Sequence, residues 1–135
     1  MIRAFLGAIL LFSSFISVPV LAQTTSDAQT MFKQANEHFV KGEYNEAIVI
    51  YDDILEVAPN NLSTLKMKAI ALSNSGYHEK SLKEFFKILQ SRPDDITALT
   101  GMGIGFGNLG EYQEAKYYFE KAVKKKSDSV VINNY

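Results

Sequence analysis

Apolar residues recur along the chain at helical spacing, in pairs of segments that are separated by a glycine. In the first segment, Met31, Ala35 and His38 lie at i, i+4 and i+7, the spacing of one face of a helix. A second stripe follows, formed by Tyr44, Ala47, Ile48, Tyr51 and Ile54. Gly42 separates the two stripes because Gly tolerates the left-handed conformation that ends a helix, and Pro59 ends the second. The pattern predicts two amphipathic helices that are joined by a short turn.

This helix pair occurs three times, with a period of 34 residues and no gap. The period relates Gly42 to Gly76 and Gly110, and it relates Pro59 to Pro93. Four further columns keep the same register: Met31, Leu65 and Leu99; Ala35, Ala69 and Gly103; Ala47, Ser81 and Ala115; Tyr51, Phe85 and Phe119. One such pair is too small to bury its apolar face alone, so neighbouring pairs must stack. The repeat therefore predicts an all-α solenoid of three helix-turn-helix units.

In these columns the sequence resembles the tetratricopeptide repeat family. The resemblance rests on KGEYNEAIVIYDDILEVAPNN, SGYHEKSLKEFFKILQSRPDD and LGEYQEAKYYFEKAVKKKSDS, and it covers Ala28 to Ser127. His78, Ser81 and Ser127 depart from the residues usual in the family without disturbing the register. The predicted repeats are residues 28–61, 62–95 and 96–129, followed by a partial C-terminal cap over residues 130–135.

The first 22 residues have the pattern of a secretory signal peptide. Arg3 precedes an apolar run over residues 4–18, and the segment closes with Val20-Leu21-Ala22, which has small or apolar residues at the two sites that a signal peptidase reads. We expect cleavage after Ala22, which leaves residues 23–27 as a short linker. The alternative is an uncleaved anchor helix, which serines and Pro19 make a poor membrane span. The sequence predicts an exported protein, secreted or at the cell surface, with membrane contact only if this segment is retained.

A glycine-rich segment, TGMGIGFGNLG, contains the pattern G-x-G-x-x-G from Gly105 to Gly110. That pattern binds a dinucleotide only where it follows a strand and opens a helix, whereas Pro93 and the two acids after it predict a helix start. Gly105 and Gly107 therefore fall inside a helix, and we expect no cofactor. Each helical Gly costs roughly 1 kcal/mol relative to Ala, so replacing Gly105 by Ala should stabilise the fold unless a neighbouring backbone fills the space. Close packing or drift, and an adaptable wall of a binding surface, both remain explanations for the glycines.

Composition and charge argue against several classes of function. The 135-residue chain has no Cys and a formal net charge of −1, which excludes a thiolate metal site and disfavours nucleic-acid binding through phosphate contacts. His38 and His78 are isolated, and no catalytic triad or H-x-x-x-H ligand spacing occurs. We therefore expect no catalytic residues, no metal site, no small-molecule substrate and no enzymatic activity. Asn61 begins a possible glycosylation sequon, Asn-Leu-Ser, on an exposed turn.

The resemblance implies a concave surface that is lined by the first helix of each pair and binds an extended peptide or a partner helix. The peptide-binding residues implied here are Phe32, Asn36 and Phe39; Lys66, Ile70 and Asn74; and Thr100, Ile104 and Asn108. Family members that hold a C-terminal carboxylate use a basic clamp, which would need Lys at Thr97 and Arg at Gly101. Of the clamp positions only Asn36 fits, so acidic chaperone tails are disfavoured as ligands.

The predicted function is that of an exported protein-interaction module, a scaffold or assembly adaptor that binds a protein or peptide partner. The alternative is a self-associating structural component of the cell envelope. The apolar residues between Val130 and Tyr135 are expected to lie against Phe119 and Val123 as a partial cap. Apolar surface that remains exposed commonly marks an association site, so this C-terminal end is also predicted to form a homo-oligomer or to stack on a partner.

Overall fold

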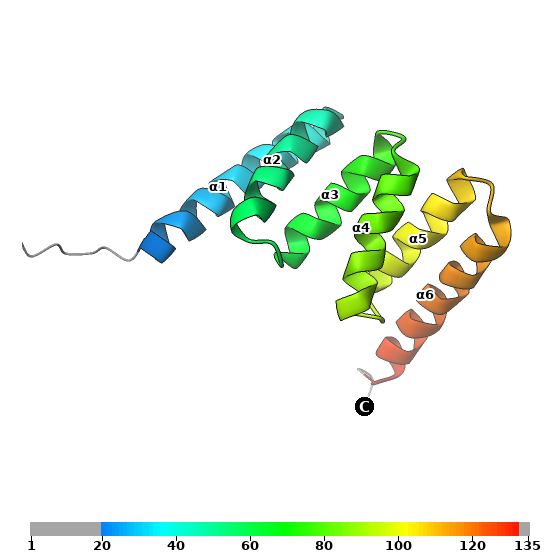
Figure 1. The fold of residues 1–135 in the computed structure, drawn as a ribbon. Coiled ribbons are helices and arrows are strands. Elements are labelled where there is room, and N and C mark those ends of the chain that lie inside the picture. The colour runs from blue at the N-terminus through cyan, green and yellow to red at the C-terminus, as the bar shows by residue number, and fades with distance from the viewer. Residues whose placement is uncertain (1–19, 133–135) are drawn as a thin grey trace, which may run out of the picture.

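The computed structural model describes residues 20–132, with side chains described for residues 26–129, and this part of the chain forms six α-helices. The helices are α1 (Val20–Val40), α2 (Tyr44–Val57), α3 (Leu62–Asn74), α4 (His78–Ser91), α5 (Ile96–Asn108) and α6 (Tyr112–Ile132). Consecutive helices pack against one another throughout the array (Figure 1). The described residues contain no strand, and the predicted all-α solenoid of three helix pairs is confirmed. Apart from its last three residues, the predicted signal peptide lies outside the described residues.

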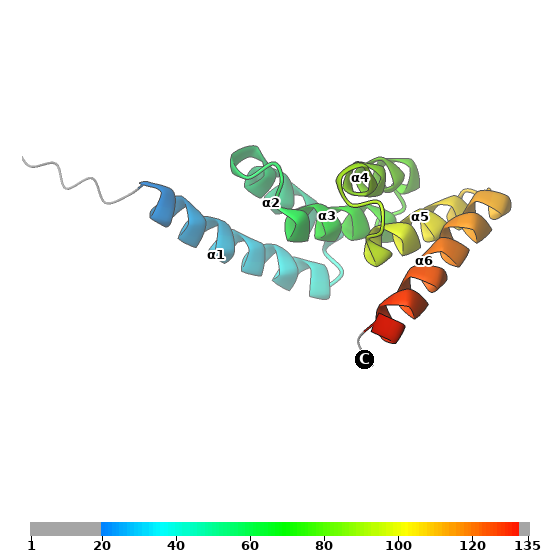
Figure 2. The ribbon, with the colours of Figure 1, turned by 90° about the horizontal axis from the view of Figure 1, so that it is seen from below.

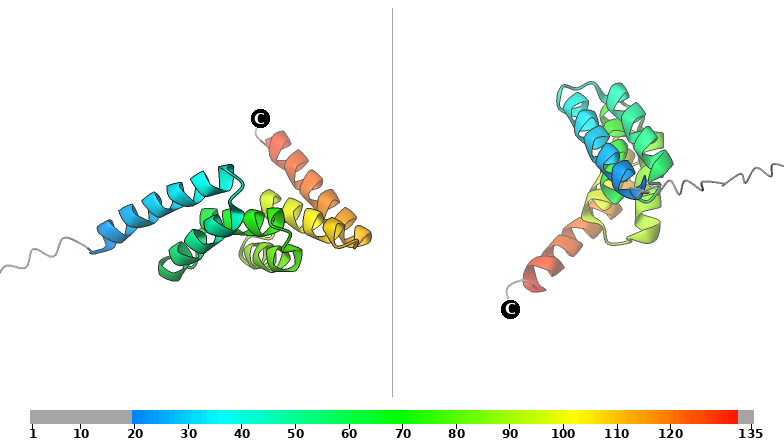
Figure 3. Two further views of the ribbon diagram at one scale, coloured as in Figure 1. Left: turned by 90° about the horizontal axis from the view of Figure 1, so that it is seen from above. Right: turned by 90° about the vertical axis from the view of Figure 1, so that its left-hand side faces the viewer.

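The first helices of the pairs share one side of the molecule. Figure 2 shows α1, α3 and α5 on one side, with α2 and α4 on the other. The left view of Figure 3 agrees with this arrangement and shows α6 ending on the same side as α1. The surface formed by α1, α3 and α5 is called the first-helix face below.

Each helix pair turns at a glycine with positive φ. Gly42, Gly76 and Gly110 have φ angles of 81°, 82° and 83°, in the left-handed region that residues with a Cβ rarely adopt. After the first turn the amide of Glu43 donates to the carbonyl of His38 over 3.0 Å, and equivalent bonds close the other two turns. This bond satisfies a carbonyl that the helix end leaves free. The three turns are therefore structurally equivalent, as the 34-residue period predicts.

The connections between repeats end one helix with proline and begin the next with a side-chain cap. Asn61 accepts a hydrogen bond from the amide of Thr64 at 3.1 Å, and Asp95, 34 residues later, accepts one from Ala98 at 3.0 Å. Pro59 and Pro93 lie two residues before these caps. Proline lacks an N–H and disfavours helical conformation in the preceding residue, so α2 and α4 stop there.

Helix α6 has no such stop, and this corrects the predicted end of the third repeat. Ser127 occupies the position of Pro59 and Pro93, and its hydroxyl donates to the carbonyl of Val123 at 3.1 Å within the helix. The helix therefore continues to Ile132 and has 21 residues, against 14 in α4. The predicted fold-back against Phe119 and Val123 is wrong for residues 130–132, because they extend the same helix. Residues 133–135 lie outside the described residues.

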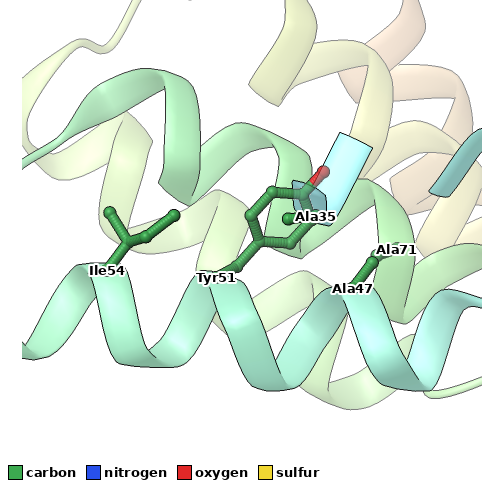
Figure 4. Close-up of a cluster of buried hydrophobic side chains, with 5 residues drawn as sticks. All are labelled: Ala35, Ala47, Tyr51, Ile54 and Ala71. Atoms are coloured by element: carbon green, nitrogen blue, oxygen red, sulfur yellow. The ribbon is translucent and has the colours of Figure 1, made fainter. Parts of the chain in front are cut away.

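The core lies within each helix pair and between neighbouring pairs. In the first cluster, the Tyr51 ring points from α2 towards Ala35 of α1, and Ala47 lies next to Ala71 of α3 (Figure 4). The second cluster is built in the same way around Phe85, Ile88, Ala69, Ala98 and Met102. Tyr51 and Phe85 are 0% and 1% exposed, whereas Phe119, the third residue of the same column, is 40% exposed. The array thus ends in the described part of the chain with an aromatic residue that no following helix covers.

Candidate functional site

The first-helix face contains a pocket of about 400 Å³ between α3 and α5. Residues of three helices line it: Ile70, Ser73 and Asn74 from α3, Phe85 from α4, and Ile96, Thr97, Thr100, Gly101 and Ile104 from α5. None of these residues is charged. Apolar walls with a few hydroxyl and amide groups are typical of a pocket that receives an apolar group and orients it through hydrogen bonds.

Four of the nine predicted peptide-binding residues meet in this pocket. Ile70 and Asn74 approach from α3, and Thr100 and Ile104 approach from α5. Ile104 is 45% exposed, so its side chain is available to a ligand. Stacking of the second and third repeats therefore brings together residues that are 30 positions apart in the sequence.

Gly101 allows α5 to approach the floor of this pocket. A Cβ added to Gly101 would lie 2.3 Å from the nearest atoms of the Phe85 ring, far inside van der Waals contact. The basic clamp of the carboxylate-binding relatives would require an arginine at this position. Its side chain would have to displace Phe85, which is buried in the second core cluster, so packing as well as sequence disfavours the clamp.

Two further predicted residues, Phe32 and Asn36, line a separate hollow of about 530 Å³ along α1. The Tyr51 hydroxyl donates to Oδ1 of Asn36 over 2.6 Å, and the rings of Tyr51 and Phe32 have centroids 5.9 Å apart. Burial raises the pKa of Tyr51 to about 12, so the phenol remains a donor at physiological pH. The Asn36 carbonyl is thus engaged inside the first repeat, and its amide hydrogens are the groups that remain for a ligand.

The other three predicted residues lie in neither pocket. Phe39 packs edge-on against Tyr44 across the first turn, with centroids 5.3 Å apart. Nδ2 of Asn108 lies 3.4 Å from Nδ1 of His78. Nζ of Lys66 lies 2.6 Å from a carboxylate oxygen of Asp95, and both side chains are largely shielded from solvent. Each of these residues contacts its own repeat or its neighbour, which a helical spacing on one face does not reveal.

The pocket also contains residues outside the predicted set. Ser73 lies one position before Asn74, and Ile96 begins α5 directly after the Asp95 cap. Phe85 belongs to the aromatic column of the 34-residue period, and that pattern assigns it only to the core. The signal that could identify Phe85 is Gly101 itself, because a glycine inside a helix indicates close approach by a neighbouring group.

A metal site and a membrane span each place requirements on the described residues. Among them, no group of three or more His, Asp or Glu side chains is placed to hold a metal ion. None of the described helices combines the length and apolar character needed to cross a membrane. Asn61 of the glycosylation sequon is exposed and uses its Oδ1 to cap α3, and its glycosylation remains a prediction.

Comparison with known proteins agrees with the repeat geometry. The family model described as tetratricopeptide repeat matches residues 106–127, which include the turn at Gly110 and most of α6. The crystal structure of the Sgt2 TPR domain from Aspergillus fumigatus superposes with a TM-score of 0.69 at 27% identity, covering 75% of this chain and 67% of that chain. The chain belongs to the tetratricopeptide repeat family. Such repeats form protein-interaction scaffolds, and in this one the pocket between α3 and α5 lies on the first-helix face.

Two curated tetratricopeptide repeat relatives match over about half of this chain. One is the TPR repeat-containing thioredoxin TTL4 of Arabidopsis thaliana, 35% identical over 63 residues, which are 47% of this chain and 9% of that protein. The other is the heat-shock protein cognate co-chaperone sgt12 of Aspergillus fumigatus, 32% identical over 66 residues, which are 49% of this chain and 19% of that protein. The matches therefore span only a small part of either relative.

A solved structure at lower identity shows the same fold. The first TPR of Spaghetti (RPAP3), bound to the HSP90 peptide SRMEEVD, has a TM-score of 0.69 at 20% identity and covers 74% of this chain and 79% of that chain. At this identity the likeness concerns the fold alone.

Proposed function

We propose that this tetratricopeptide repeat chain is an exported protein-interaction module that binds a peptide or a partner helix on its first-helix face. The observation that carries the proposal is the uncharged pocket between α3 and α5, where Ile70, Asn74, Thr100 and Ile104 converge. A pocket of about 400 Å³ receives one large apolar side chain of a ligand. Asn74 and Thr100 then border the ligand with groups that hydrogen-bond a backbone.

The charge distribution favours an apolar anchor over an acidic tail. Lys66 is the one cation among the predicted peptide-binding residues, and its ion pair with Asp95 at 2.6 Å compensates its charge. A glycine at position 101 removes the other site at which a clamp would place a cation. The peptide in the RPAP3 structure ends in Glu-Glu-Val-Asp, and we infer that this chain selects a ligand of different chemistry.

Export is proposed from the pattern of residues 1–22. The test is N-terminal sequencing of protein recovered outside the cytoplasm after expression of the full chain in its own cells. A sequence that begins at Gln23 is expected. Retention in the cytoplasm with Met1 intact would contradict export, and membrane-bound protein with an intact N-terminus would support the anchor alternative.

Peptide binding in the pocket between α3 and α5 is tested by selection from a displayed library of random peptides. Enriched peptides are expected to share one large apolar residue and to bind whether or not their C-terminus is free. Ile70→Asp places a charge in the pocket and should abolish this binding. Val49→Asp is the matched control, because Val49 is an exposed apolar residue of α2 on the other side of the molecule.

Two outcomes would contradict the proposed peptide binding in this pocket. One is that no peptide family is enriched, and the other is that Ile70→Asp binds the selected peptides as well as Val49→Asp does. Thermal unfolding of both variants separates loss of binding from loss of folding. The comparison is valid only if both variants show the cooperative unfolding transition of a folded protein.

A second candidate function is a self-associating component of the cell envelope. Phe119 and Val123 at the C-terminal end of the array are 40% and 65% exposed. Apolar residues with this exposure on a helix that ends a solenoid favour stacking on another molecule.

A further inference from the structure

The junction between the second and third repeats is built from two close contacts between α4 and α5. Gly101 lies against Phe85, and Gly105 lies against Leu82: a Cβ on these glycines would come within 2.3 Å and 2.6 Å of the facing side chain. The aromatic position of one repeat therefore faces position 101, and the aliphatic position three residues before it faces position 105.

The junction between the first and second repeats uses the same positions, 34 residues earlier. Tyr51 and Ile48 of α2 take the places of Phe85 and Leu82, while Met67 and Ala71 of α3 take the places of the two glycines. All four belong to the first core cluster. The four positions are thus the stacking contact of this solenoid, and the same period identifies them at its two ends.

The end of the array at α6 presents Phe119 and Lys116 at these positions. Phe119 is 40% exposed, and the Lys116 side chain is 69% exposed, with only a long 3.8 Å pairing to Glu120 on its own helix. The end at α1 presents Lys33 and Glu37, both exposed. Lys33 corresponds to Met67 and Gly101 of the internal helices, and Glu37 corresponds to Ala71 and Gly105. The first helix therefore has one cation and one anion at positions that are uncharged inside the array.

We propose that a second copy of this chain stacks head to tail on the first, with α1 of one copy packed on α6 of the next. In the register of the internal junctions, Phe119 faces Lys33 of the second copy and Lys116 faces its Glu37. A lysine over an aromatic ring is attractive, and the second contact joins opposite charges. The two ends are complementary to each other, whereas α6 packed on a second α6 would leave Lys33 and Glu37 without a partner.

The lengths of the terminal helices also suit this arrangement. Helices α1 and α6 each have 21 residues, against 13 in α3 and 14 in α4. The additional residues are at the start of α1 and at the end of α6. Because neighbouring helices of a junction run antiparallel, continuing the register places residues 126–130 of α6 beside residues 23–27 of the next copy, which remain after the proposed cleavage behind Ala22. Both extensions lie at the same edge of the new junction and lengthen it.

The contact is heterologous, so each added copy offers a free end and the assembly continues beyond two copies, as an open chain or until a ring closes. Its residues lie on α1 and α6, away from the pocket between α3 and α5. Self-association through these ends is therefore independent of binding in the pocket between α3 and α5, and Ile70→Asp is expected to leave it unchanged.

Sedimentation velocity over a concentration series tests the proposal, with the N-terminal segment in the state in which the cell leaves it. The weight-average mass is expected to rise with protein concentration and to fall with added salt. Glu37→Lys and Lys116→Glu should each weaken association by roughly tenfold or more, because each brings like charges face to face. Both residues are exposed, so the melting temperature should change little.

An equimolar mixture of the two variants separates this arrangement from other interfaces. The new lysine of the Glu37→Lys variant then faces the new glutamate of the Lys116→Glu variant. At the alternate junctions the two unchanged residues, Lys116 and Glu37, face each other, so the mixture should associate as the wild type does. Glu46→Lys, which makes the same charge change at an exposed position of α2, should have no effect. A wild type that stays monomeric to about 1 mM, a Glu37→Lys variant that still associates, or a mixture that stays monomeric would each overturn the proposal.

Discussion

Gly101 lies so close to the ring of Phe85 that an added Cβ would come within 2.3 Å of it. Gly103 is in the same relationship to Phe119, at 2.7 Å, and Gly105 to Leu82, at 2.6 Å. Two of these glycines therefore face α4 and one faces α6. These contacts favour close packing as the reason for the glycine-rich segment, and they explain how a helix with low intrinsic propensity remains in the core of the array.

Gly107 is the exception, and it supplies the first prediction. The nearest atom to an added Cβ is the Cβ of Ala115 at 3.9 Å, an ordinary contact. Gly107→Ala should therefore gain helix propensity without strain, stabilise the chain by roughly 1 kcal/mol and raise its melting temperature by several degrees. Gly101→Ala should destabilise it by roughly 1–3 kcal/mol, because the Phe85 ring must move. Thermal unfolding of the two variants measures both changes in stability. Equal effects of the two substitutions would contradict the different packing of Gly101 and Gly107.

Gly105→Ala is expected from the sequence to stabilise the fold unless a neighbouring backbone fills the space. In the structure a side chain fills it, since Cγ of Leu82 would lie 2.9 Å from the new Cβ. We therefore expect Gly105→Ala to be less stable than Gly107→Ala. In the double variant with Leu82→Ala, the space is open and the Ala at position 105 should become favourable relative to Gly, which a double-mutant cycle measures.

The sequence predicts the turns and helix starts well because each depends on a few local residues. Gly42, Gly76 and Gly110 supply the left-handed conformation, and Asn61 and Asp95 supply the caps. The peptide-binding surface is predicted less well, because the helical spacing does not show which polar groups find partners inside the fold. The hydroxyl of Tyr51 comes from another helix to reach Asn36, and the carboxylate of Asp95 comes from the connection after α4 to reach Lys66. These partners depend on how the helices pack against one another, which the spacing along a single helix does not show.

The length of α6 leads to a further prediction. The departure of Ser127 from the proline column is visible in the sequence, but the column alone does not show that the helix continues. Ser127→Pro should end α6 at this position, because proline removes an intrahelical donor and restricts the residue before it. Backbone chemical shifts of residues 128–132 should then lose their helical values, while Ser127→Ala should retain them. Helical shifts that persist beyond residue 127 in the proline variant would show that packing, and not the missing proline, extends the helix.

The buried phenol of Tyr51 makes stability depend on pH in the alkaline range. Burial raises its pKa to about 12 from an ordinary value of 10.0. The unfolded chain therefore loses this proton first, so the phenol's contribution is complete below pH 10 and is lost as the pH rises towards 12. The loss amounts to roughly 2 kcal/mol. Denaturant unfolding of wild type and Tyr51→Phe should show a difference in stability that changes between pH 10 and pH 12 as the wild type loses stability, and a constant difference would contradict this assignment.

The last prediction concerns the ion pair beside the pocket. Asp95 caps α5 through Oδ1 and pairs with Lys66 through Oδ2. Asp95→Asn should keep the cap, since Asn61 performs that role at the equivalent position of α3, but it removes the anion and leaves the Lys66 charge free. The wild type should not bind the peptide SRMEEVD measurably, because it has no clamp for a carboxylate. The Asp95→Asn variant should gain weak binding that disappears with added salt, which fluorescence polarisation of the labelled peptide measures.

Glu46→Gln is the control for this prediction, because it removes an equal charge from the exposed surface of α2, and it should gain no binding. Tight binding by the wild type, or equal gains in the two variants, would show that Lys66 does not decide the ligand charge of the first-helix face.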